Sequence, residues 1–444
     1  MDFSLFTEKL FARAKERGLE KCEVYSTKTD SFRAAIHEGN LVQYSVSQGG
    51  GLTFRALYQG KMGVVSTQVL DEEAIGFLID GAIENAAMIE NDDPQFLVEA
   101  GSEYVAMDNY SEKVAQPTAQ EKIQLARDLE KMAAESDPRI RPNYSSVFSS
   151  ISEERLVNSL GLDLSYRDSM FGFSVSLQAR EGEDLTTGGR MVFGRDPEAL
   201  SREEAVQYAV DEALTSLGGQ PVPTGTYPVL MRREAMADML SCFDSVFSAE
   251  MAQKGLSLLK GREGEVIASD KLTIVDDPHH PTATRSMPFD GEGSPTYKKN
   301  VVENGKLMTL LHNLKTANKQ GVATTGNASR SGGGVGVAPF NFYIQPGQRN
   351  LEEMAAAMGE GLLITDLAGL HSGANQISGD FSLGASGYLI ENGKVGRSVR
   401  QITIAGNFFQ MLKDIVEVGS DMEFTPGGTG CPTVWVSGLS VAGK

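Results

Sequence analysis

The chain has 444 residues, of which 41% are hydrophobic and 22% are charged, a composition typical of a folded globular protein. This length exceeds one ordinary domain and suggests about three. The 40 Lys and Arg residues against 59 Asp and Glu residues give a formal net charge of −19. Such a charge repels a phosphate backbone, and no basic cluster in the sequence offsets it, so we expect no nucleic-acid partner.

The apolar and cysteine patterns favour the cytoplasm. The first residues include Asp2 and no continuous apolar stretch, which predicts neither a secretory signal nor a membrane anchor. No later run approaches the roughly 18 to 20 apolar residues of a membrane span. Cys22, Cys242 and Cys431 are too few and too scattered for a disulfide framework or a paired-cysteine zinc site. We therefore expect a cytoplasmic protein that does not bind membranes.

Residues 1–105 are predicted to form the first α+β domain. Apolar residues that share one face predict a helix over 4–17. Turn signals at Gly39 and Gly60 punctuate the sheet that follows, and Asp71 is expected to cap a second helix. The strand-like segments of this sheet are 21–28, 31–37, 41–48 and 51–58.

A second α+β domain is expected over 106–221. Thr118–Glu121 has the pattern of a capping box and predicts the start of a helix, and Ser201–Glu204 predicts another helix start. Strand-length segments lie between them, within 140–195. The Pro- and Gly-rich segment 220–228 then marks the clearest boundary in the chain.

Residues 222–444 are predicted to form a mostly β domain, either a sandwich or a partial barrel. The domain begins with a helical run over about 232–260 and is then rich in glycine and in strand-length apolar segments. Asn304–Gly305 and Asn392–Gly393 supply the two positive-φ positions of a type I′ turn and predict β-hairpins. The expected fold class is thus α+β, with two small α+β modules before a mostly β C-terminal domain.

The sequence contains no His-Glu zinc-protease helix. Such a helix places two His ligands on one face with a Glu beside the first, so that metal and general base share one water. Among the five histidines only His37 is followed by Glu, and Leu41 and Val42 occupy the positions where a second His would be needed. Ser257 has the Ser-x-x-Lys spacing of some acyl-transfer enzymes, but the accompanying motifs are missing.

Two other segments are candidates for binding. Asp276, Asp277, His279 and His280 place four potential metal ligands within five residues. Adjacent side chains of an extended chain point to opposite sides, so a polar loop is favoured over a metal site. The Gly-rich segment 324–336 lacks the pattern of a phosphate-binding loop, but its backbone N–H groups and Arg330 are able to hold a carboxylate or an extended peptide.

Six segments, in this order, make the chain resemble the TldD/PmbA family, whose members are often labelled modulators of DNA gyrase and are classed as metallopeptidases. The resemblance implies two smaller N-terminal modules, a β-rich C-terminal domain, and pairing as dimers around a substrate channel. The segments that carry it are Leu272–Pro278, Phe289–Gly293, Val302–Lys306, Thr325–Asn327, Ser378–Tyr388 and Gly438–Gly443.

The resemblance also identifies the branch of the family. The TldD branch carries a His-Glu-x-x-x-His helix, whereas Leu240, Ser241 and Ser245 occupy the matching positions here. That branch also uses a cysteine ligand in a longer C-terminal loop, and Cys431 falls after that loop. The chain therefore resembles the PmbA branch, also called TldE. This implies no catalytic residue and no cofactor in this chain, with zinc expected in a catalytic partner.

The first functional hypothesis is a non-catalytic subunit that clamps unfolded or leader peptides and pairs with a TldD-like zinc-bearing subunit or with itself. The alternatives are an independent homodimeric hydrolase with an atypical metal site at His279 or His280, and a partner-binding module of the gyrase-modulator type without peptidase activity. An extended peptide can add to a β edge with little demand on its sequence. The candidate peptide-binding residues are Gly326, Asn327, Arg330, Asn375, Gln376, Ser378, Ser382 and Ser386.

Overall fold

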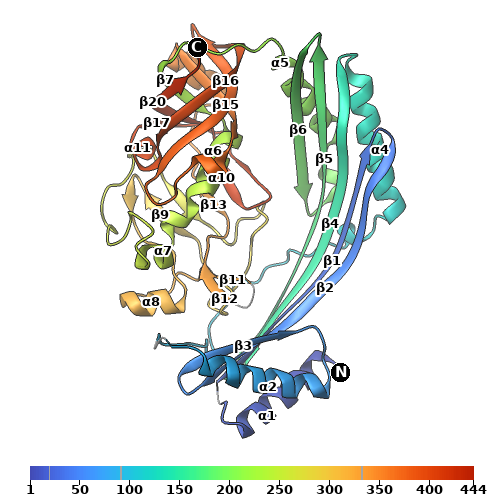
Figure 1. Ribbon diagram of the computed structural model, residues 1–444, viewed down its shortest axis with the longest axis vertical. Helices are drawn as coiled ribbons and strands as arrows, with labels where there is room; N and C mark the ends of the chain where they lie inside the picture. The colour runs from blue at the N-terminus through green and yellow to red at the C-terminus, as the bar shows by residue number, and fades with distance from the viewer. Residues whose placement is uncertain (20, 91–92, 332–333) are drawn as a thin grey trace.

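The computed structural model describes residues 1–19, 21–90, 93–331 and 334–444 (Figure 1). A long antiparallel sheet lies along one side of the molecule and a β-rich C-terminal body along the other, with helices α1 and α2 at one end (Figure 1). The predicted α+β class with a mostly β C-terminal domain is confirmed. No helix among the described residues is both long and apolar enough to cross a membrane.

The long sheet has the strand order β3-β2-β1-β4-β5-β6. Strand β1 pairs with β4 from Glu23 opposite Asn158 to Ile36 opposite Ser145, so a single sheet serves both N-terminal regions. The strands are β1 Cys22–His37, β2 Asn40–Tyr58, β3 Lys61–Thr67, β4 Ile140–Asn158, β5 Asp163–Glu181 and β6 Asp184–Gly194.

The prediction of four short strands over 21–58 is wrong. These residues form two long strands, β1 and β2, joined by the predicted turn, where Glu38 and Gly39 have φ angles of 50° and 74°. The ladder continues through three consecutive glycines of β2 without turning. A Cβ atom on Gly50 would lie 2.6 Å from the carbonyl oxygen of Thr27, so glycine here permits a close approach of two strands instead of a turn.

Helices cover this sheet at both ends, α1 and α2 at one end and α4 and α5 at the other (Figure 1). The predicted caps form: Asp71 accepts the N–H of Ala74 at 2.8 Å, and Thr118 makes a reciprocal capping box with Glu121. Ser201 caps α5 by accepting the N–H of Glu204 at 3.1 Å, which is one half of the predicted capping box. The helices are α1 Phe3–Glu16, α2 Glu72–Ala87, α3 Glu112–Ala115, α4 Ala119–Ser136, η1 Pro197–Ala199 and α5 Arg202–Thr215.

The C-terminal body is built on a closed β-barrel. Its strands follow one another as β16-β15-β14-β7-β20, and β16 pairs with β20 to close the ring, while β17 extends from β20. The apolar sides of these strands enclose the largest hydrophobic core of the molecule. The strands are β7 Gly225–Met231, β14 Gly361–Ala368, β15 Asp380–Glu391, β16 Lys394–Asn407, β17 Ile415–Val418 and β20 Val434–Ala442.

A second sheet and a two-stranded ribbon complete this body. The sheet has the order β10-β9-β8-β13-β19-β18 and the ribbon consists of β11 and β12. The predicted Asn-Gly hairpins both form, with Asn304 and Asn392 at φ angles of 46° and 52°. The strands are β8 Ile274–Asp276, β9 Lys299–Glu303, β10 Lys306–Leu307, β11 Ala328–Ser331, β12 Gly334–Val337, β13 Phe342–Ile344, β18 Glu423–Phe424 and β19 Thr429–Cys431.

The helical run predicted over 232–260 is broken into shorter pieces. Ser248 adopts extended backbone angles, φ −78° and ψ 124°, and ends the helical path after η2. The helices of the body are α6 Arg233–Phe243, η2 Asp244–Phe247, α7 Ala249–Gln253, α8 Leu314–Gln320, α9 Leu351–Met358, α10 Leu370–Gly373 and α11 Phe408–Lys413.

A buried charge cluster ties the C-terminal body to the long sheet. Arg330 of β11 donates to the carboxylate of Glu23 on β1, and the Nε atom of Arg55 on β2 lies 3.3 Å from the same carboxylate oxygen. The side chains of all three are at most 8% exposed. We call these residues the Glu23 cluster. Burial lowers the pKa of Arg55, and Glu23 opposes that effect.

Candidate functional site

Helix α6 borders a hollow of about 1030 Å³ in the C-terminal body. Asp238, Ser241 and Cys242 of α6 face this hollow, since positions three and four apart share one face of a helix. The opposite face of α6 carries Leu240 and Phe243, which are fully buried in the core. The other wall is the segment 370–382, which includes α10 and the start of β15.

The three positions that match the zinc helix of the TldD branch lie here. Leu240 points into the core, Ser241 lines the hollow, and Ser245 donates from its hydroxyl to Oε1 of Gln376 at 3.3 Å. Gln376 in turn donates to the carbonyl oxygen of Cys242 at 2.7 Å. These two hydrogen bonds connect the segment 370–382, which forms the other wall of the hollow, to α6 and the turn that follows it.

The residues at these positions do not fit a zinc ion. An alkyl side chain and two hydroxyls replace the imidazoles and carboxylate that zinc prefers. Within the described ranges, no group of three or more His, Cys, Asp or Glu residues is placed to hold a metal. His279 and His280 do not change this result. His279 Nε2 lies 3.0 Å from the hydroxyl of Thr296, and the ring of His280 packs on Phe424 with centroids 4.7 Å apart.

Burial weakens the ionisation of three groups on α6 and at its C-terminal end. The pKa of Asp238 is raised, mainly by burial and further by Asp366 and Glu234. Burial also raises the pKa of Asp244 to about 6, although Arg285 and the backbone N–H of Ser245 oppose the shift. Cys242 has a raised pKa for the same main reason, so its thiol lacks the thiolate character of a catalytic nucleophile.

A second hollow of about 500 Å³ lies between the long sheet and the C-terminal body. Several of its charged side chains form ion pairs: Arg232 pairs with Glu212 at 2.6 Å and Arg233 pairs with Glu423 at 3.0 Å. Tyr208 of α5 also donates to the carboxylate of Glu234 on α6 at 2.9 Å. These contacts join α5 to α6 across the second hollow.

The two hollows are neighbours along α6 and β15. Ala237 borders the second hollow, and the next residue, Asp238, borders the first. Ser382 borders the first and Ser386 the second, and both lie on the same side of β15 because alternate residues of a strand share a face. Gly384 lies between them. We call the two hollows together the α6 trough.

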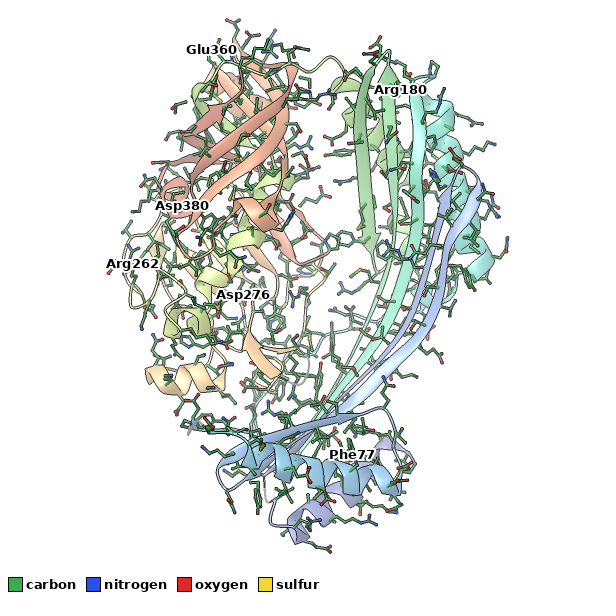
Figure 2. The ribbon with its side chains drawn as sticks, viewed as in Figure 1. Phe77, Arg180, Arg262, Asp276, Glu360 and Asp380 are labelled. Carbon is green, nitrogen blue, oxygen red and sulfur yellow. The ribbon has the colours of Figure 1, made fainter. Side chains whose placement is uncertain are left out.

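The structure brings some of the predicted peptide-binding residues together. Asn375, Gln376 and Ser382 line the first hollow, and Ser386 lines the second. Ser378 lies in the same loop, where its backbone N–H donates to Oδ1 of Asn375 at 3.2 Å. Asp380 follows this loop on the C-terminal body, far from Phe77 on α2 (Figure 2).

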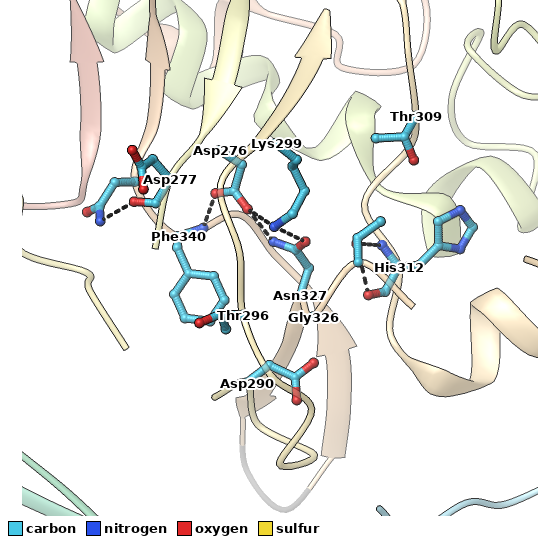
Figure 3. A network of polar contacts seen from close by, with 12 residues as sticks. Asp276, Asp277, Asp290, Thr296, Lys299, Thr309, His312, Gly326, Asn327 and Phe340 are labelled. Atoms are coloured by element: carbon cyan, nitrogen blue, oxygen red, sulfur yellow. Dashed lines mark hydrogen bonds and ion pairs between the residues drawn. The ribbon is translucent and has the colours of Figure 1, made fainter. Parts of the chain in front are cut away.

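Gly326, Asn327 and Arg330 lie elsewhere, at the base of the β11–β12 ribbon. Asn327 is fully buried and donates to the carboxylate of Asp276 at 2.7 Å, which also accepts from Lys299 at 3.0 Å (Figure 3). Gly326 has a φ angle of 65°, and a Cβ there would lie 2.6 Å from a backbone oxygen of the neighbouring segment. Arg330 belongs to the Glu23 cluster. All three residues make contacts that shape the ribbon.

The predicted peptide-binding residues include none from α6, although Ser241 was identified as a match to the zinc helix. Asp238, Ser241 and Cys242 recur at helical spacing opposite the buried residues of α6, and this periodicity is visible in the sequence. No sequence periodicity of this kind marks Asp366 and Tyr208. They come from β14 and α5, and only the tertiary fold brings them to α6.

Comparisons with known proteins agree with this fold. Models described as PmbA/TldA metallopeptidase domain 1, central domain and C-terminal domain match residues 22–86, 112–217 and 224–443. The chain therefore belongs to the PmbA/TldD metallopeptidase family, as its resemblance predicted.

Individual relatives match along nearly the whole chain. Metalloprotease PmbA of Escherichia coli O157:H7 is 28% identical over 427 residues, which are 95% of this chain and 92% of that protein. The crystal structure of a proposed modulator of a DNA gyrase from Thermotoga maritima has a TM-score of 0.94 and 36% identity, and covers 99% of this chain and 100% of that one. TldE from Thermococcus kodakarensis has a TM-score of 0.91 at 24% identity, with 99% and 100% coverage, and shares the fold.

Proposed function

We propose that this chain is the non-catalytic, substrate-clamping subunit of a PmbA/TldD-type metalloprotease complex. It acts in the cytoplasm, pairs with a relative that carries the His-Glu-x-x-x-His helix, and holds unfolded or leader peptides in an extended form. Zinc and the chemistry of peptide hydrolysis are supplied by the relative.

One observation carries this proposal. Two hollows lie beside each other along α6 and β15, yet the positions of the zinc helix hold Leu240, Ser241 and Ser245. Installing ligands there would also disturb the core, because Leu240 is fully buried. A chain that has the recess of a peptidase and lacks its ligands is suited to binding a peptide without cleaving it.

The trough wall suits an extended peptide. Ser382 and Ser386 carry small side chains on one side of β15, and Gly384 between them carries none, so a peptide backbone can approach closely without a steric demand on its own side chains. The amides of Asn375 and Gln376 at the first hollow offer donors and acceptors to peptide groups. Binding of this kind depends more on the backbone of the peptide than on its sequence.

Co-expression with a zinc-bearing relative tests the proposal. Cleavage of an unstructured fluorogenic peptide is measured for the relative alone and for the purified complex. We expect the complex to cleave at least about tenfold faster. Ser382→Trp places a bulky ring in the first hollow and should abolish this gain without preventing assembly. Ala134→Trp, on the exposed side of α4, is the matched control and should leave the gain unchanged.

The proposal fails if no complex forms, or if the complex is no more active than the relative alone. It also fails if Ser382→Trp and Ala134→Trp behave alike. Metal analysis of this chain purified alone distinguishes the proposal from the alternative of an independent hydrolase. That alternative requires a stoichiometric transition metal whose binding depends on His279 or His280.

A further inference from the structure

Helix α4 carries a buried lysine with no carboxylate beside it. Lys122 is 8% exposed, and its ammonium group donates to the hydroxyl of Ser149 on β4 at 2.8 Å. An ammonium group has three N–H donors, and no second acceptor for Lys122 is found among the described residues. Arg55 and Lys299 are as deeply buried, but each contacts a carboxylate. Such pairing is the rule for buried charges, because water no longer stabilises them.

The sheet beneath Lys122 forms a polar gap between two aromatic rings. Ser149 pairs with Phe32 of β1 on one side and with Phe171 of β5 on the other, so the three side chains lie in a row on one face. The Nζ atom of Lys122 lies 4.9 Å from the centre of the Phe32 ring. The ring attracts the ammonium group but does not neutralise its charge. Burial lowers the pKa of Lys122, and no carboxylate in the described part of the chain opposes that effect.

A hollow of about 490 Å³ borders Lys122. It lies between α4, β5 and the start of α5, and its volume is within the range of about 300–1,000 Å³ that is usual for small-molecule sites. Such sites combine an apolar wall with a few polar groups that orient the ligand. The apolar wall here consists of Pro117, Leu125, Phe171, Phe173 and Pro197.

The other charged side chains that line this hollow already have partners. Arg202 lies 4.0 Å from Asp128, and both side chains are more than 40% exposed. Glu198 pairs with a lysine of α3 at 3.2 Å and is 83% exposed. Glu121 closes the capping box of α4. Of the charged groups that line the hollow, Lys122 is therefore the one that is both buried and without an opposite charge.

We propose that this hollow binds a small monocarboxylic acid that carries an aromatic or branched alkyl group. The carboxylate meets the ammonium group of Lys122, and the apolar group packs on Leu125 and Phe173. Charge complementarity selects this occupant, because an acid supplies the opposite charge that Lys122 lacks. Helix α4 lies on the side of the long sheet away from the C-terminal body (Figure 1), so the inference does not rest on the proposed function.

The single charge of Lys122 narrows the class of ligand. One carboxylate neutralises it, whereas a second carboxylate or a phosphate dianion would place an unpaired charge against Phe171 and Phe173. An apolar group adds affinity by leaving water for the apolar wall. Acetate lacks that group and gains only the ion pair. Phenylacetate has both the single charge and the ring.

Calorimetric titration of the full chain with phenylacetate tests the proposal. We expect a Kd of about 1 mM or tighter. Phenylacetamide has the same ring without the negative charge, and acetate has the charge without the ring. Each should bind at least about tenfold more weakly than phenylacetate, and inorganic phosphate should bind no better than acetate. These comparisons need no substitution, so they are independent of any effect on folding.

Lys122→Met tests the residue itself. Methionine keeps an unbranched apolar side chain and removes the charge, so phenylacetate should bind at least about tenfold more weakly while the binding of phenylacetamide stays the same. Lys131→Met is the matched control, because Lys131 lies on the same helix with its side chain 72% exposed. That change should leave both ligands unaffected. Circular dichroism confirms that the two variants keep their fold.

Four outcomes overturn the inference. The first is no binding of phenylacetate at concentrations up to about 10 mM. The second is equal binding of phenylacetate and phenylacetamide. The third is binding of acetate or phosphate as tightly as phenylacetate, which would define a plain anion site. The fourth is equal affinity of Lys122→Met and Lys131→Met for phenylacetate. Peptide clamping and its loss through Ser382→Trp enter none of these measurements, so the two proposals fail separately.

Discussion

Replacing Glu23 by Gln should be among the most damaging single changes to this fold. The substitution keeps the shape of the side chain but removes the negative charge between Arg55 and Arg330, whose side chains are 6% and 8% exposed. Two guanidinium groups then stay buried without the carboxylate that contacts both of them, although the charge of Glu292 still acts on each. Removing one member of a buried ion pair typically costs about 3–5 kcal/mol, because the remaining charge is left uncompensated. We expect a loss in this range.

Urea-induced unfolding followed by circular dichroism measures this loss through the transition midpoint and slope. Asp80→Asn is the matched control, since Asp80 pairs with Arg17 at 2.8 Å while both side chains are more than half exposed. That change should cost less than about 1 kcal/mol. Adding Arg330→Met to Glu23→Gln should recover part of the loss, because it removes one of the two unpaired charges. A loss for Glu23→Gln no larger than that of the control would refute the reasoning.

Three further predictions concern packing, pH and capping. A Cβ on Gly188 would lie 2.0 Å from a backbone oxygen of α5, so Gly188→Ala should lower the unfolding free energy by about 1–3 kcal/mol or more in the urea assay. Gly189→Ala is the control. A Cβ on Gly189 would have its nearest atom at 3.4 Å, so this change should leave the unfolding free energy nearly unaltered. Burial raises the pKa of Asp244 from 3.8 to about 6, so its stabilising contribution is full below pH 4 and is lost as the pH rises through 6. Asp244→Asn should therefore match the unmodified chain near pH 4 and exceed it above pH 7 by at most about 3 kcal/mol, and equal pH profiles in thermal unfolding would contradict this. Thr118→Ala should cost about 1 kcal/mol in urea unfolding through loss of the α4 capping box, and Thr118→Ser should restore most of it.

The features of this fold that the sequence predicted are those set by a few neighbouring residues. The caps at Asp71 and Thr118 and the Asn-Gly turns at Asn304 and Asn392 depend on local hydrogen bonds and φ angles, which the residue types determine. Pairing of β1 with β4 and closure of the barrel by β16 and β20 join residues far apart in the chain. No local pattern encodes those partners, so the shared sheet became visible only in three dimensions.

In the candidate site, too, some features could be predicted from the sequence and others could not. Asn327 and Asn375 are the same residue type in similar glycine-rich segments, yet Asn327 is fully buried beside Asp276 and Asn375 borders the first hollow. A polar side chain serves a buried network as readily as a ligand, and sequence alone does not separate these uses. Leu240 is different, because an alkyl group cannot ligate a metal in any environment, and its meaning was therefore clear from the sequence.

The pairing of β1 with β4 joins the two N-terminal regions in one sheet, and this limits where genes of this family can recombine. A gene fragment that ends near residue 105 would encode β1 without β4, and Phe32, Ala34 and Ile36 would lose the helices α4 and α5 that cover them. Recombination at this point of the sequence would separate β1 from its partner β4. Relatives that share this sheet should therefore inherit residues 1–221 as one block, and crossovers should survive mainly at the Pro- and Gly-rich segment that precedes the barrel.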